Sequence, residues 1–416
     1  MTIKVLHVST YDANGGAGRA AYSLHKALRQ HGVQSRMIVA DKSSSDPTVI
    51  QKGHARWKVT RRLDRQLWRL QSSPVKTWRS PARFGALSAQ WINKTDADVV
   101  HLHWITDGFL SIEEIGKIEK PIVWSMYDLW PIAGTEHYGV GFGSERWKDG
   151  YTSSNRPQGD SRFDIDRWAY GRKVKSWPTS GRMTPHLLPA STWLENSVRA
   201  SALARHWPST RIPHVLDNEI FYPSDSTEAR RELGLPTDCP IVFFLSSAGI
   251  EDRRKGFDVL EHALDIIHPE HPGLRVLIAG PRHPHKETAG GVPIIWAGPV
   301  ESDQVLRLLY CASTLVVVPS REDNMPLTAM EARSCGRPVV GSDVGGIPDI
   351  IQGPEDGELV TSDDPPALAA SLTKNLHDPS MATTKLATNL PWDAPSVIPQ
   401  VLDVYLTIGA GGTHEY

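Results

Sequence analysis

The chain has 416 residues, a formal net charge of −2 and three cysteines. This length exceeds one ordinary hydrophobic core, so we expect two domains. The balanced charge argues against a nucleic-acid partner, and Cys239, Cys311 and Cys335 lack the paired spacing of a disulfide framework or a zinc site. No signal peptide and no apolar run long enough to span a bilayer are evident, so the sequence predicts a cytoplasmic protein.

Strands and helices alternate along both halves of the chain. In the first half, apolar patterns predict a helix over 18–32 and strands at 3–9, 35–40, 98–104, 121–126, 187–190 and 212–216. In the second half, they predict helices over 257–267 and 366–376 and strands at 240–245, 274–279, 294–297, 314–318 and 338–341. The repeated β-α-β order predicts an α/β protein of two doubly wound, Rossmann-like domains.

The domain boundary is predicted where Pro223 and polar residues interrupt the pattern, at 222–228. We therefore place the first domain at 1–222 and the second at 223–395. The segment 396–416 contains a last helix, which we expect to pack back toward the first domain. Residues 139–185 have little periodicity and are long for a loop, so they form either an active-site or acceptor-binding insertion or a disordered solvent loop.

Two acids, Asp323 and Glu331, lie eight residues apart after the strand at 314–318 and around the start of a helix. The carboxyl ends of parallel strands are where open α/β sheets bind ligands. A carboxylate there can accept hydrogen bonds from two hydroxyl groups, as a ribose or a hexose offers. Taken alone, the pair equally fits an ordinary helix with one acid near its start and another on the surface.

A cationic turn, Arg253-Arg254-Lys255-Gly256, follows the strand at 240–245 and precedes a helix. Cations beside a helix N-terminus form a site for a diphosphate, and each charge-assisted hydrogen bond contributes about 1.5–3 kcal/mol. Where the negative charge builds up only as a bond breaks, this stabilisation lowers the barrier. The alternative is a solvated basic turn.

Glycine turns follow other strands. In the second half, Gly345-Gly346-Ile347-Pro348 follows the strand at 338–341, and Gly298 lies in a turn suited to holding a nucleobase by main-chain groups. In the first half, Gly15 and Gly16 precede a helix, where they either approach an anion or make only a tight turn. Four loops of the second domain therefore carry cations, carboxylates and glycines to one sheet edge.

This combination resembles the family-4 retaining glycosyltransferases of GT-B fold, whose E-x7-E motif is matched by the pair ending at Glu331, with Asp323 in place of the first Glu. The run Cys335-Gly336-Arg337-Pro338-Val339-Val340 adds to the resemblance. The sequences Glu322-Asp323-Asn324-Met325-Pro326 and Val123-Trp124-Ser125-Met126-Tyr127-Asp128-Leu129-Trp130-Pro131 resemble a branch that acts in colanic acid and other exopolysaccharide synthesis. The similarity covers nearly the whole chain except roughly 45–90 and 139–185.

The resemblance implies two domains that face each other across a cleft. It implies transfer of a sugar from a nucleotide diphosphate sugar, UDP- or GDP-linked, to a hydroxyl of a glycan, lipid-linked or small-molecule acceptor, with retention and without metal or cofactor. The donor contacts are then expected from Gly15, Gly16, Arg253, Arg254, Lys255, Gly298, Asp323, Asn324, Met325, Leu327 and Glu331. The catalytic residues are expected to be Asp128, Arg254, Lys255 and Asp323.

One departure concerns the acceptor side. The family commonly has His where this chain has Tyr127, and tyrosine is a poor base at neutral pH. Tyr127, His103 and His137 are the expected acceptor contacts, although His103 equally fits a satisfied strand histidine. Retention of this kind requires no enzyme base, because the leaving phosphate itself can take the proton of the acceptor.

Residues 52–79 carry nine Lys or Arg and one acid, Asp64. A helical stripe of apolar residues runs through this segment, with tryptophans nearby. The stripe consists of Val59, Leu63, Leu67 and Leu70, and the tryptophans are Trp57, Trp68 and Trp78. Such a segment either contacts an anionic membrane peripherally, at the inner face, or packs on its own domain with a solvated basic face.

Two other functions stay open. A sugar-nucleotide epimerase shares this fold and acts without an acceptor, so products formed from donor alone discriminate it. A catalytically silent glycan-binding protein is favoured by Tyr127, and it predicts that Glu331→Ala and Lys255→Ala leave the cellular role intact.

Overall fold

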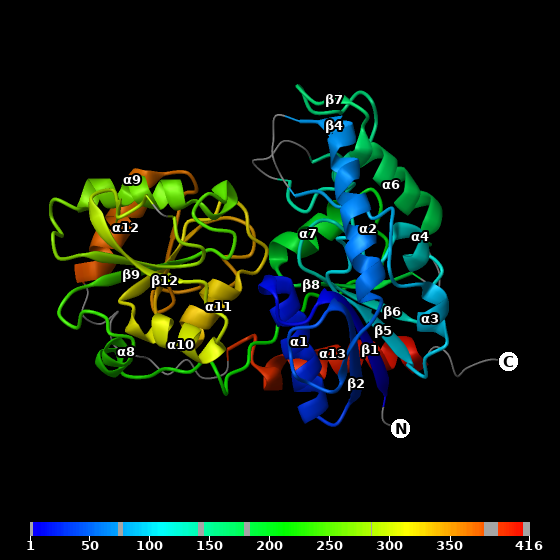
Figure 1. Ribbon diagram of the computed structural model, residues 1–416, viewed down its shortest axis with the longest axis horizontal. Helices are drawn as coiled ribbons and strands as arrows, with labels where there is room; N and C mark the ends of the chain where they lie inside the picture. The colour runs from blue at the N-terminus through cyan, green and yellow to red at the C-terminus, as the bar shows by residue number, and fades with distance from the viewer. Residues whose placement is uncertain are drawn as a thin grey trace. The chain divides into compact units, whose positions relative to one another are not determined.

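The computed structural model describes residues 3–73, 78–139, 145–178, 184–283, 285–377 and 390–410. The chain divides into two compact units (Figure 1). One unit comprises Met1–Val215 and Ala394–Tyr416, and the other Leu216–Asp393. The sequence predicts these two boundaries at 222/223 and 395/396, whereas the structure has them at 215/216 and 393/394. Both units are α/β with parallel sheets, which confirms the predicted fold class.

The first unit is built on a six-stranded sheet in the order β3-β2-β1-β5-β6-β8, and every pair in it is parallel. These strands are β1 (Lys4–Tyr11), β2 (Gln34–Asp41), β3 (Val49–Gln51), β5 (Val99–Leu102), β6 (Ile122–Met126) and β8 (His186–Pro189). A small antiparallel pair is formed by β4 (Gln71–Ser72) and β7 (Ser161–Arg162). Because β1 pairs with β2 on one side and β5 on the other, the strand order reverses beside β1, where ligands enter such sheets.

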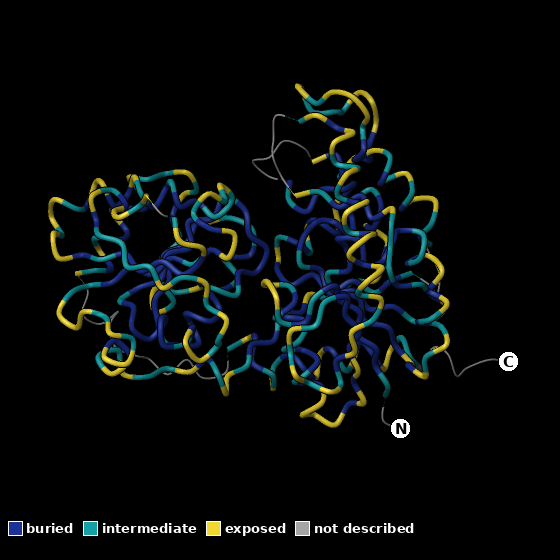
Figure 2. Tube along the Cα trace, viewed as in Figure 1, coloured by how far each residue is buried: buried dark blue, intermediate teal, exposed yellow. Residues whose placement is uncertain are grey.

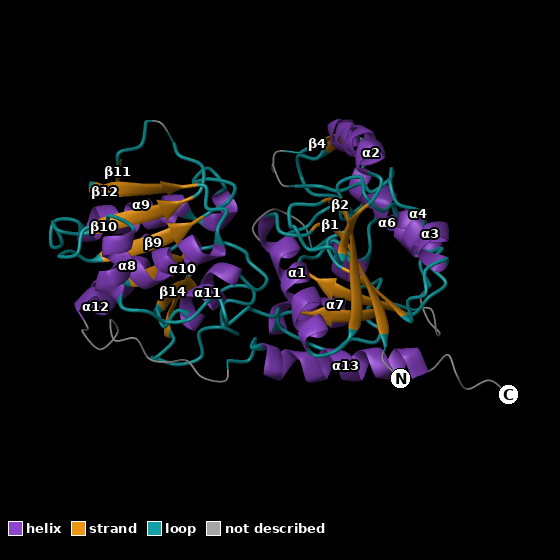
Figure 3. Cartoon of the chain, turned by 60° about the horizontal axis from the view of Figure 1, so that its bottom comes forward, coloured by secondary structure: helices purple, strands orange, loops and turns teal. Residues whose placement is uncertain are grey.

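Helices cover both faces of this sheet (Figure 3). They are α1 (Gly15–Gln30), α2 (His54–Leu67), η1 (Trp68–Leu70), α3 (Ala89–Asn93), α4 (Ile112–Ile115), α5 (Arg146–Asp149), α6 (Ile165–Ser176), α7 (Thr192–Ala200) and α13 (Ala394–Ala410). Alternate strand residues point to opposite faces. Thus Val5 packs with α1 and α13, whereas Leu6 joins the larger core formed with α2, α3, α4, α6 and α7. The last helix therefore packs on the first unit.

The second unit is built on a seven-stranded sheet in the order β11-β12-β10-β9-β13-β14-β15, antiparallel only at β11–β12. Its strands are β9 (Ile241–Leu245), β10 (Arg275–Ala279), β11 (Thr288–Ala289), β12 (Val292–Gly298), β13 (Leu315–Val318), β14 (Val339–Ser342) and β15 (Gly357–Val360). Its helices are α8 (Ser226–Glu232), η2 (Arg253–Lys255), α9 (Phe257–Ile267), α10 (Asp303–Ala312), α11 (Leu327–Ser334) and α12 (Pro365–His377).

The central strands β9, β10, β13 and β14 of this second sheet are largely apolar on both faces, as expected for a buried parallel sheet. One face, including Val242 and Phe244, packs on α9 and α12. On the other face, Phe243 lies edge-on to Tyr310 of α10, with ring centroids 5.2 Å apart. In Figure 2 the central strands of both sheets are buried and the exposed residues lie mainly on helices and loops. No helix among the described residues is long and apolar enough to cross a membrane.

Two features differ from the sequence predictions. The strand predicted at 212–216 is wrong: Leu216 makes only an isolated bridge to Asp393, because Pro213 has no N–H for a ladder. The described part of 139–185 is folded into α5, β7 and α6, and Ala169 of α6 joins the core of the first unit. The described residues of 139–185 therefore do not form the disordered solvent loop that was one of the two alternatives.

Candidate functional site

Four loops of the second unit leave the sheet at the carboxyl ends of β9, β12, β13 and β14. These strands run parallel in one sheet, so the loops lie along a single edge. The loops are those that carry the cationic turn, Gly298, the acid pair and the Gly345–Gly346 turn. This edge is where doubly wound sheets bind their ligands.

Lys255 and Asp323 form the charged centre of this edge. Lys255 Nζ lies 2.6 Å from Asp323 Oδ2, and Arg254 Nη1 lies 3.6 Å from the same oxygen. Arg254 also donates to the Glu322 carbonyl oxygen at 3.1 Å. These contacts join the cationic turn after β9 to the acid-bearing loop after β13, and the Arg321 N–H adds a hydrogen bond to the Arg254 carbonyl oxygen at 2.8 Å.

The ionisation of this centre follows from burial and charge. Burial would raise the pKa of Asp323, but the charges of Lys255 and Arg254 outweigh it, and the pKa lies below its usual value. Burial lowers the pKa of Lys255, and the Asp323 carboxylate offsets this only in part. An anion that enters here would share these cations with Asp323.

The backbones of the loops approach each other closely. A Cβ atom on Gly256 would lie 1.9 Å from the Pro319 carbonyl oxygen, and one on Gly345 would lie 1.8 Å from the Asp323 carbonyl oxygen. The Gly346 N–H donates to that same Asp323 oxygen at 3.0 Å. These glycines therefore set how near the cationic turn and the acid loop can come.

We expect Gly256→Ala to lower the free energy of unfolding of the second unit by roughly 2–4 kcal/mol, because the new methyl group collides with backbone. Gly249→Ala is the matched control, since Gly249 also has a positive φ, of 89° against 70°, but no atom lies within 4 Å of its Cβ position. It should cost only about 1 kcal/mol. Chemical denaturation of the two variants checks this, and equal losses would contradict a steric role at Gly256.

Arg321 holds the same edge together and was not singled out from the sequence. Its guanidinium donates to both oxygens of Asp258 at 2.8 Å, to Asp363 at 2.7 Å and to the Arg253 carbonyl oxygen at 2.5 Å. The two carboxylates raise the pKa of Arg321. Asp258 and Asp363 lie 63 and 42 residues from Arg321 in the sequence, so no local sequence pattern could have revealed these contacts.

Glu331 lies one turn into α11 and is buried. Its Oε2 accepts a hydrogen bond from the Tyr310 hydroxyl at 2.7 Å, and Tyr310 was also missed in the sequence. Asn324 and Met325 are buried in the loop before α11, and Leu327 begins the helix. The first N–H groups of α11 thus lie beside the acid loop, in the position that favours anions.

The two remaining glycines of the predicted donor site are open. Gly298 ends β12 with φ of 74°, and no atom lies within 4 Å of its Cβ position. In the first unit, Gly15 begins α1 with φ of 69° and the same open surroundings, and the exposed Gly16 follows it. The approach of Gly15 and Gly16 to a phosphate held in the second unit stays a prediction.

Asp128 lies after β6 and is fully engaged in hydrogen bonds. Its Oδ2 accepts from His137 Nδ1 at 2.6 Å and from Trp104 Nε1 at 3.2 Å, and its Oδ1 accepts from the Trp130 N–H at 2.9 Å. His137 Nε2 lies 2.8 Å from Ser80 Oγ. The series Asp128–His137–Ser80 has the connectivity of a nucleophilic triad. All three side chains are buried, so the arrangement instead fixes the turn between Asp128 and His137.

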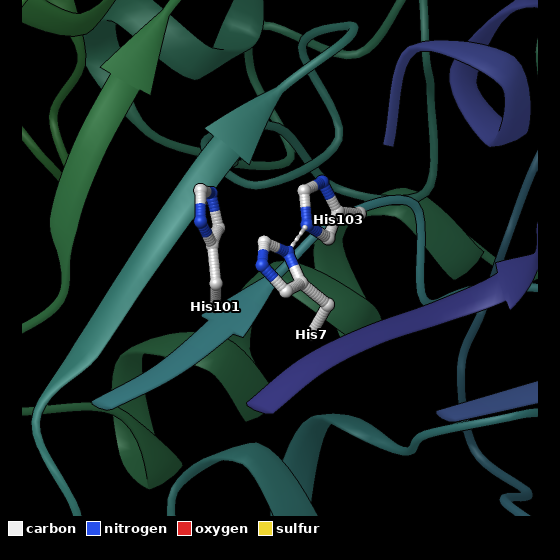
Figure 4. Close-up of side chains that lie close together, drawn as sticks. All are labelled: His7, His101 and His103. Atoms are coloured by element: carbon white, nitrogen blue, oxygen red, sulfur yellow. Dashed lines mark hydrogen bonds between the residues drawn. The ribbon is translucent and has the colours of Figure 1, made fainter. Parts of the chain in front are cut away.

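His103 belongs to a buried cluster with His7 and His101 (Figure 4), and the Tyr127 hydroxyl contacts it. His103 Nε2 lies 2.8 Å from His7 Nδ1, and His103 Nδ1 lies 2.9 Å from the Tyr127 hydroxyl. His101 is bonded in the same way to Tyr405 and Ser125, at 2.5 and 2.8 Å. Both ring nitrogens of His103 are therefore used inside the protein, as in a satisfied strand histidine.

Three nitrogens of His7, His101 and His103 lie within 4.8 Å of one another. The rings are stacked, with interplanar angles of 18–26° and centroids 4.3–5.1 Å apart. Five of the six ring nitrogens already have hydrogen-bond partners inside the protein, and only His7 Nε2 has none among the described residues. In this arrangement the cluster is a hydrogen-bonded core and not a preformed metal site.

Two family models match the chain, one in each unit. The model for "Glycosyltransferase Family 4" matches residues 14–174, and the model for "Glycosyl transferases group 1" matches residues 239–378. The second range contains the cationic turn, the acid pair and the Gly345–Gly346 turn. The first contains the glycine turn before α1 and the turn from Asp128 to His137.

Curated relatives with similar sequences are D-inositol 3-phosphate glycosyltransferases. One from Acidothermus cellulolyticus is 31% identical over 47% of this chain and 47% of its own length. One from Nocardiopsis dassonvillei is 25% identical over 81% of this chain and 77% of its own length. The chain spans about half the length of the first of these relatives.

Solved structures with the same fold include sucrose-phosphate synthase from Thermosynechococcus elongatus. The match has a TM-score of 0.66 at 18% sequence identity, and it covers 98% of this chain and 100% of the synthase chain. Anabaena HepE, solved in complex with UDP and glucose, has a TM-score of 0.64 at 15% identity over 97% and 100%. These likenesses show the GT-B fold, and each unit of the chain matches one of the two glycosyltransferase models.

Proposed function

We propose that the protein is a retaining glycosyltransferase that moves a sugar from a nucleotide diphosphate sugar to an acceptor hydroxyl. The observation that carries this proposal is the contact of Lys255 and Arg254 with Asp323 at the sheet edge that also holds Glu331. Cations, a sugar-binding carboxylate and a ribose-binding carboxylate are the groups that a nucleotide diphosphate sugar requires.

In this mechanism, Lys255 and Arg254 stabilise the negative charge that develops on the leaving diphosphate. No metal is required where these cations supply the positive charge. Glu331 accepts hydrogen bonds from the ribose, and Asp323 contacts the sugar beside the main-chain groups of Asn324. The leaving phosphate takes the proton of the acceptor, so retention needs no separate base.

The acceptor side is proposed at the carboxyl ends of β5 and β6. Asp128 accepts three hydrogen bonds and is thus better suited to hold the His137 turn than to move a proton. Tyr127 follows β6 directly, with its hydroxyl turned toward His103. The motif around Asp323 and the turn after β6 support a glycan or lipid-linked acceptor in exopolysaccharide synthesis, and UDP or GDP as the carrier.

A panel of UDP-, GDP- and ADP-sugars tests this proposal, with slow hydrolysis and saturation-transfer NMR as readouts. We expect one nucleotide sugar to bind and to be hydrolysed slowly, with net retention at the sugar carbon. Formation of an epimer from donor alone would indicate an epimerase instead. Absence of binding by every nucleotide sugar at millimolar concentration would contradict the proposal.

We also propose that the first unit contacts an anionic membrane through α2 and its neighbours. Among the described residues, eleven large hydrophobic side chains are exposed, and five of them lie on α2, η1 and the segments beside β4 and β7. These five are Val59, Leu63, Leu70, Trp78 and Phe163. The Phe163 N–H donates to the Leu70 carbonyl oxygen at 3.1 Å, which joins the two segments.

The charge of this surface fits an anionic bilayer. Lys58, Arg62 and Arg69 are exposed on the same elements, and Figure 2 shows exposed residues along α2 and around β7. Arg61 and Arg65 are instead paired with the buried Asp107, at 2.9 and 2.8 Å. Basic residues beside exposed apolar groups are typical of surfaces that lie on anionic lipid.

We expect Leu63→Ser, Leu70→Ser and Phe163→Ser together to lower partition onto phosphatidylglycerol vesicles by roughly a hundredfold or more, since each inserted side chain contributes about 1 kcal/mol or more. Vesicle sedimentation measures this. Ile266→Ser with Val305→Ser, exposed in the second unit, is the matched control and should change nothing. Equal binding to purely zwitterionic vesicles, or binding that salt does not weaken, would contradict the proposal.

A further inference from the structure

A buried tyrosine contacts the acid that we propose holds the ribose. The helices α10 and α11 are neighbours (Figure 1), and the Tyr310 hydroxyl of α10 donates to Glu331 Oε2 of α11 at 2.7 Å. Tyr310 is fully buried and Glu331 is 1% exposed. At this depth the carboxylate is oriented by donors of the protein and not by bulk water. Tyr310 supplies one such donor, and its hydrogen bond restricts rotation of the carboxylate.

The ring of Tyr310 is held by two other aromatic rings. Phe243 of β9 lies edge-on to it, with ring centroids 5.2 Å apart and an interplanar angle of 77°. Phe221, in the segment before α8, also lies edge-on to it, at 6.4 Å and 69°. Both phenylalanines are buried. Because a tyrosine side chain has only two torsion angles, these contacts hold its hydroxyl toward Glu331.

The backbone that carries Tyr310 is anchored as well. Ser313 ends α10, where its N–H donates to the Tyr310 carbonyl oxygen at 3.0 Å and its hydroxyl donates to the Leu309 carbonyl oxygen at 2.7 Å. The buried Arg230 caps the same turn, with Nε donating to the Ala312 carbonyl oxygen at 2.7 Å. Such donors satisfy the last carbonyl groups of a helix and favour its C-terminal dipole. The last turn of α10 is therefore a fixed support for Tyr310.

We propose that Tyr310 is a positioning residue for the donor nucleotide, which holds the Glu331 carboxylate in the orientation that accepts hydrogen bonds from the ribose hydroxyls. This inference rests on the proposed function and deepens it, because it makes the preference for ribose over deoxyribose depend on a residue that does not touch the nucleotide. An acceptor that is already oriented avoids the ordering cost that binding would otherwise carry.

Tyr310→Phe tests this proposal because it removes the hydroxyl and keeps the ring. Calorimetry measures binding of UDP, GDP and their 2′,3′-dideoxy analogues. We expect Tyr310→Phe to weaken binding of the ribonucleotide that the wild type prefers by about tenfold, the effect of one lost hydrogen bond to a charged group, and to change binding of its dideoxy analogue by less than about twofold. Equal losses for the two nucleotides, or no loss for either, would overturn the proposal.

A double-mutant cycle with Glu331→Ala tests whether Tyr310 acts through that carboxylate. In the Glu331→Ala background, Tyr310→Phe should cause no further loss of ribonucleotide binding, because the group that it positions is absent. A loss of the same size in both backgrounds would show that Tyr310 acts elsewhere and would contradict the proposal. Tyr222→Phe is the matched control and should bind every nucleotide as the wild type does, since Tyr222 is 46% exposed and packs against Arg307 of the same helix.

Transfer kinetics give a readout that a general loss of structure would not reproduce. The ribose contacts are the same in the bound donor and in the transition state, so their loss acts on donor binding and not on the chemical step. Tyr310→Phe should therefore raise KM for the donor by about tenfold and leave kcat within about threefold. A fall in kcat that exceeds the rise in KM would contradict a positioning role.

These measurements separate the inference from the proposed function. If the wild type binds neither UDP nor GDP, the proposed donor is wrong and the role of Tyr310 is wrong with it. If the wild type prefers a ribonucleotide to its dideoxy analogue and Tyr310→Phe keeps that whole preference, only the role of Tyr310 is wrong. Should Tyr310→Phe fail to fold, Phe221→Leu keeps the hydroxyl and loosens the ring, and it should lower the preference by about threefold. An unchanged preference in Phe221→Leu would then overturn the proposal.

Discussion

Lys255→Met is expected to lower kcat/KM for sugar transfer by about 10²–10³-fold, the effect of removing one donor that stabilises a developing negative charge. The Lys255 ammonium lies 2.6 Å from Asp323, and its side chain is half-buried. Arg254 stays 3.6 Å from Asp323 and preserves part of the charge. Initial rates with the nucleotide sugar that the panel identifies measure the loss.

The same substitution leaves the Asp323 carboxylate with less compensation, and removing one partner of a buried pair costs about 3–5 kcal/mol. Lys255→Met with Asp323→Asn removes both charges and should recover stability without recovering activity. Lys286→Met is the matched control, because Lys286 forms a comparable ion pair with Glu261 elsewhere in the second unit, at 2.5 Å. If transfer by Lys255→Met stays within threefold of wild type, Lys255 does not hold the leaving group.

The sheet edge that we propose binds the donor was largely predictable because each of its motifs lies in the loop after an apolar run. The runs before Arg253 and before Asp323 are β9 and β13, and parallel strands necessarily present such loops at one edge. Arg321 and Tyr310 were not predictable, because their partners are distant in sequence and reach them only through the fold. Local spacing contains no information about such pairs.

The buried face of α2 shows a different limit. Its stripe of Val59 and Leu63 suggests the buried side, yet Trp57, Thr60 and Asp64 are the buried residues. Asp64 accepts hydrogen bonds from the N–H groups of residues 82, 83 and 84, and Thr60 donates to the Gly108 carbonyl oxygen at 2.7 Å. A face buried by satisfying backbone groups is polar, so hydrophobic periodicity points the wrong way.

The buried histidines predict that the first unit loses stability steeply as pH falls below about 6.5. Burial lowers the pKa of His7, His101 and His103 well below the usual value, and that of His25 to about 4. These rings stay neutral in the folded state, whereas the unfolded chain binds protons below pH 6.5. Since the unfolded state binds more protons there, each ring removes up to about 1.4 kcal/mol of stability per pH unit.

Two buried carboxyl groups act with the opposite sign. Burial raises the pKa of Asp64 to about 6 and that of Glu136 to about 7, so the folded state holds these protons more tightly than the unfolded chain. Each therefore stabilises the fold as pH falls through this range. The measured dependence of the unfolding free energy on pH is therefore the difference between the histidine and the carboxyl contributions. Only variants that delete one titrating group isolate the contribution of the histidines.

His7→Asn isolates one histidine, because an asparagine amide can take the place of Nδ1, which lies 2.8 Å from His103 Nε2, without binding a proton. Unfolding free energies from pH 5 to 8 should show a slope below pH 6.5 that is shallower in His7→Asn by about 1.4 kcal/mol per pH unit. Asp64→Asn is the control of opposite sign and should make the slope steeper. If His7→Asn has the slope of the wild type, His7 is protonated in the folded state, and the neutral, stacked arrangement of the cluster is wrong.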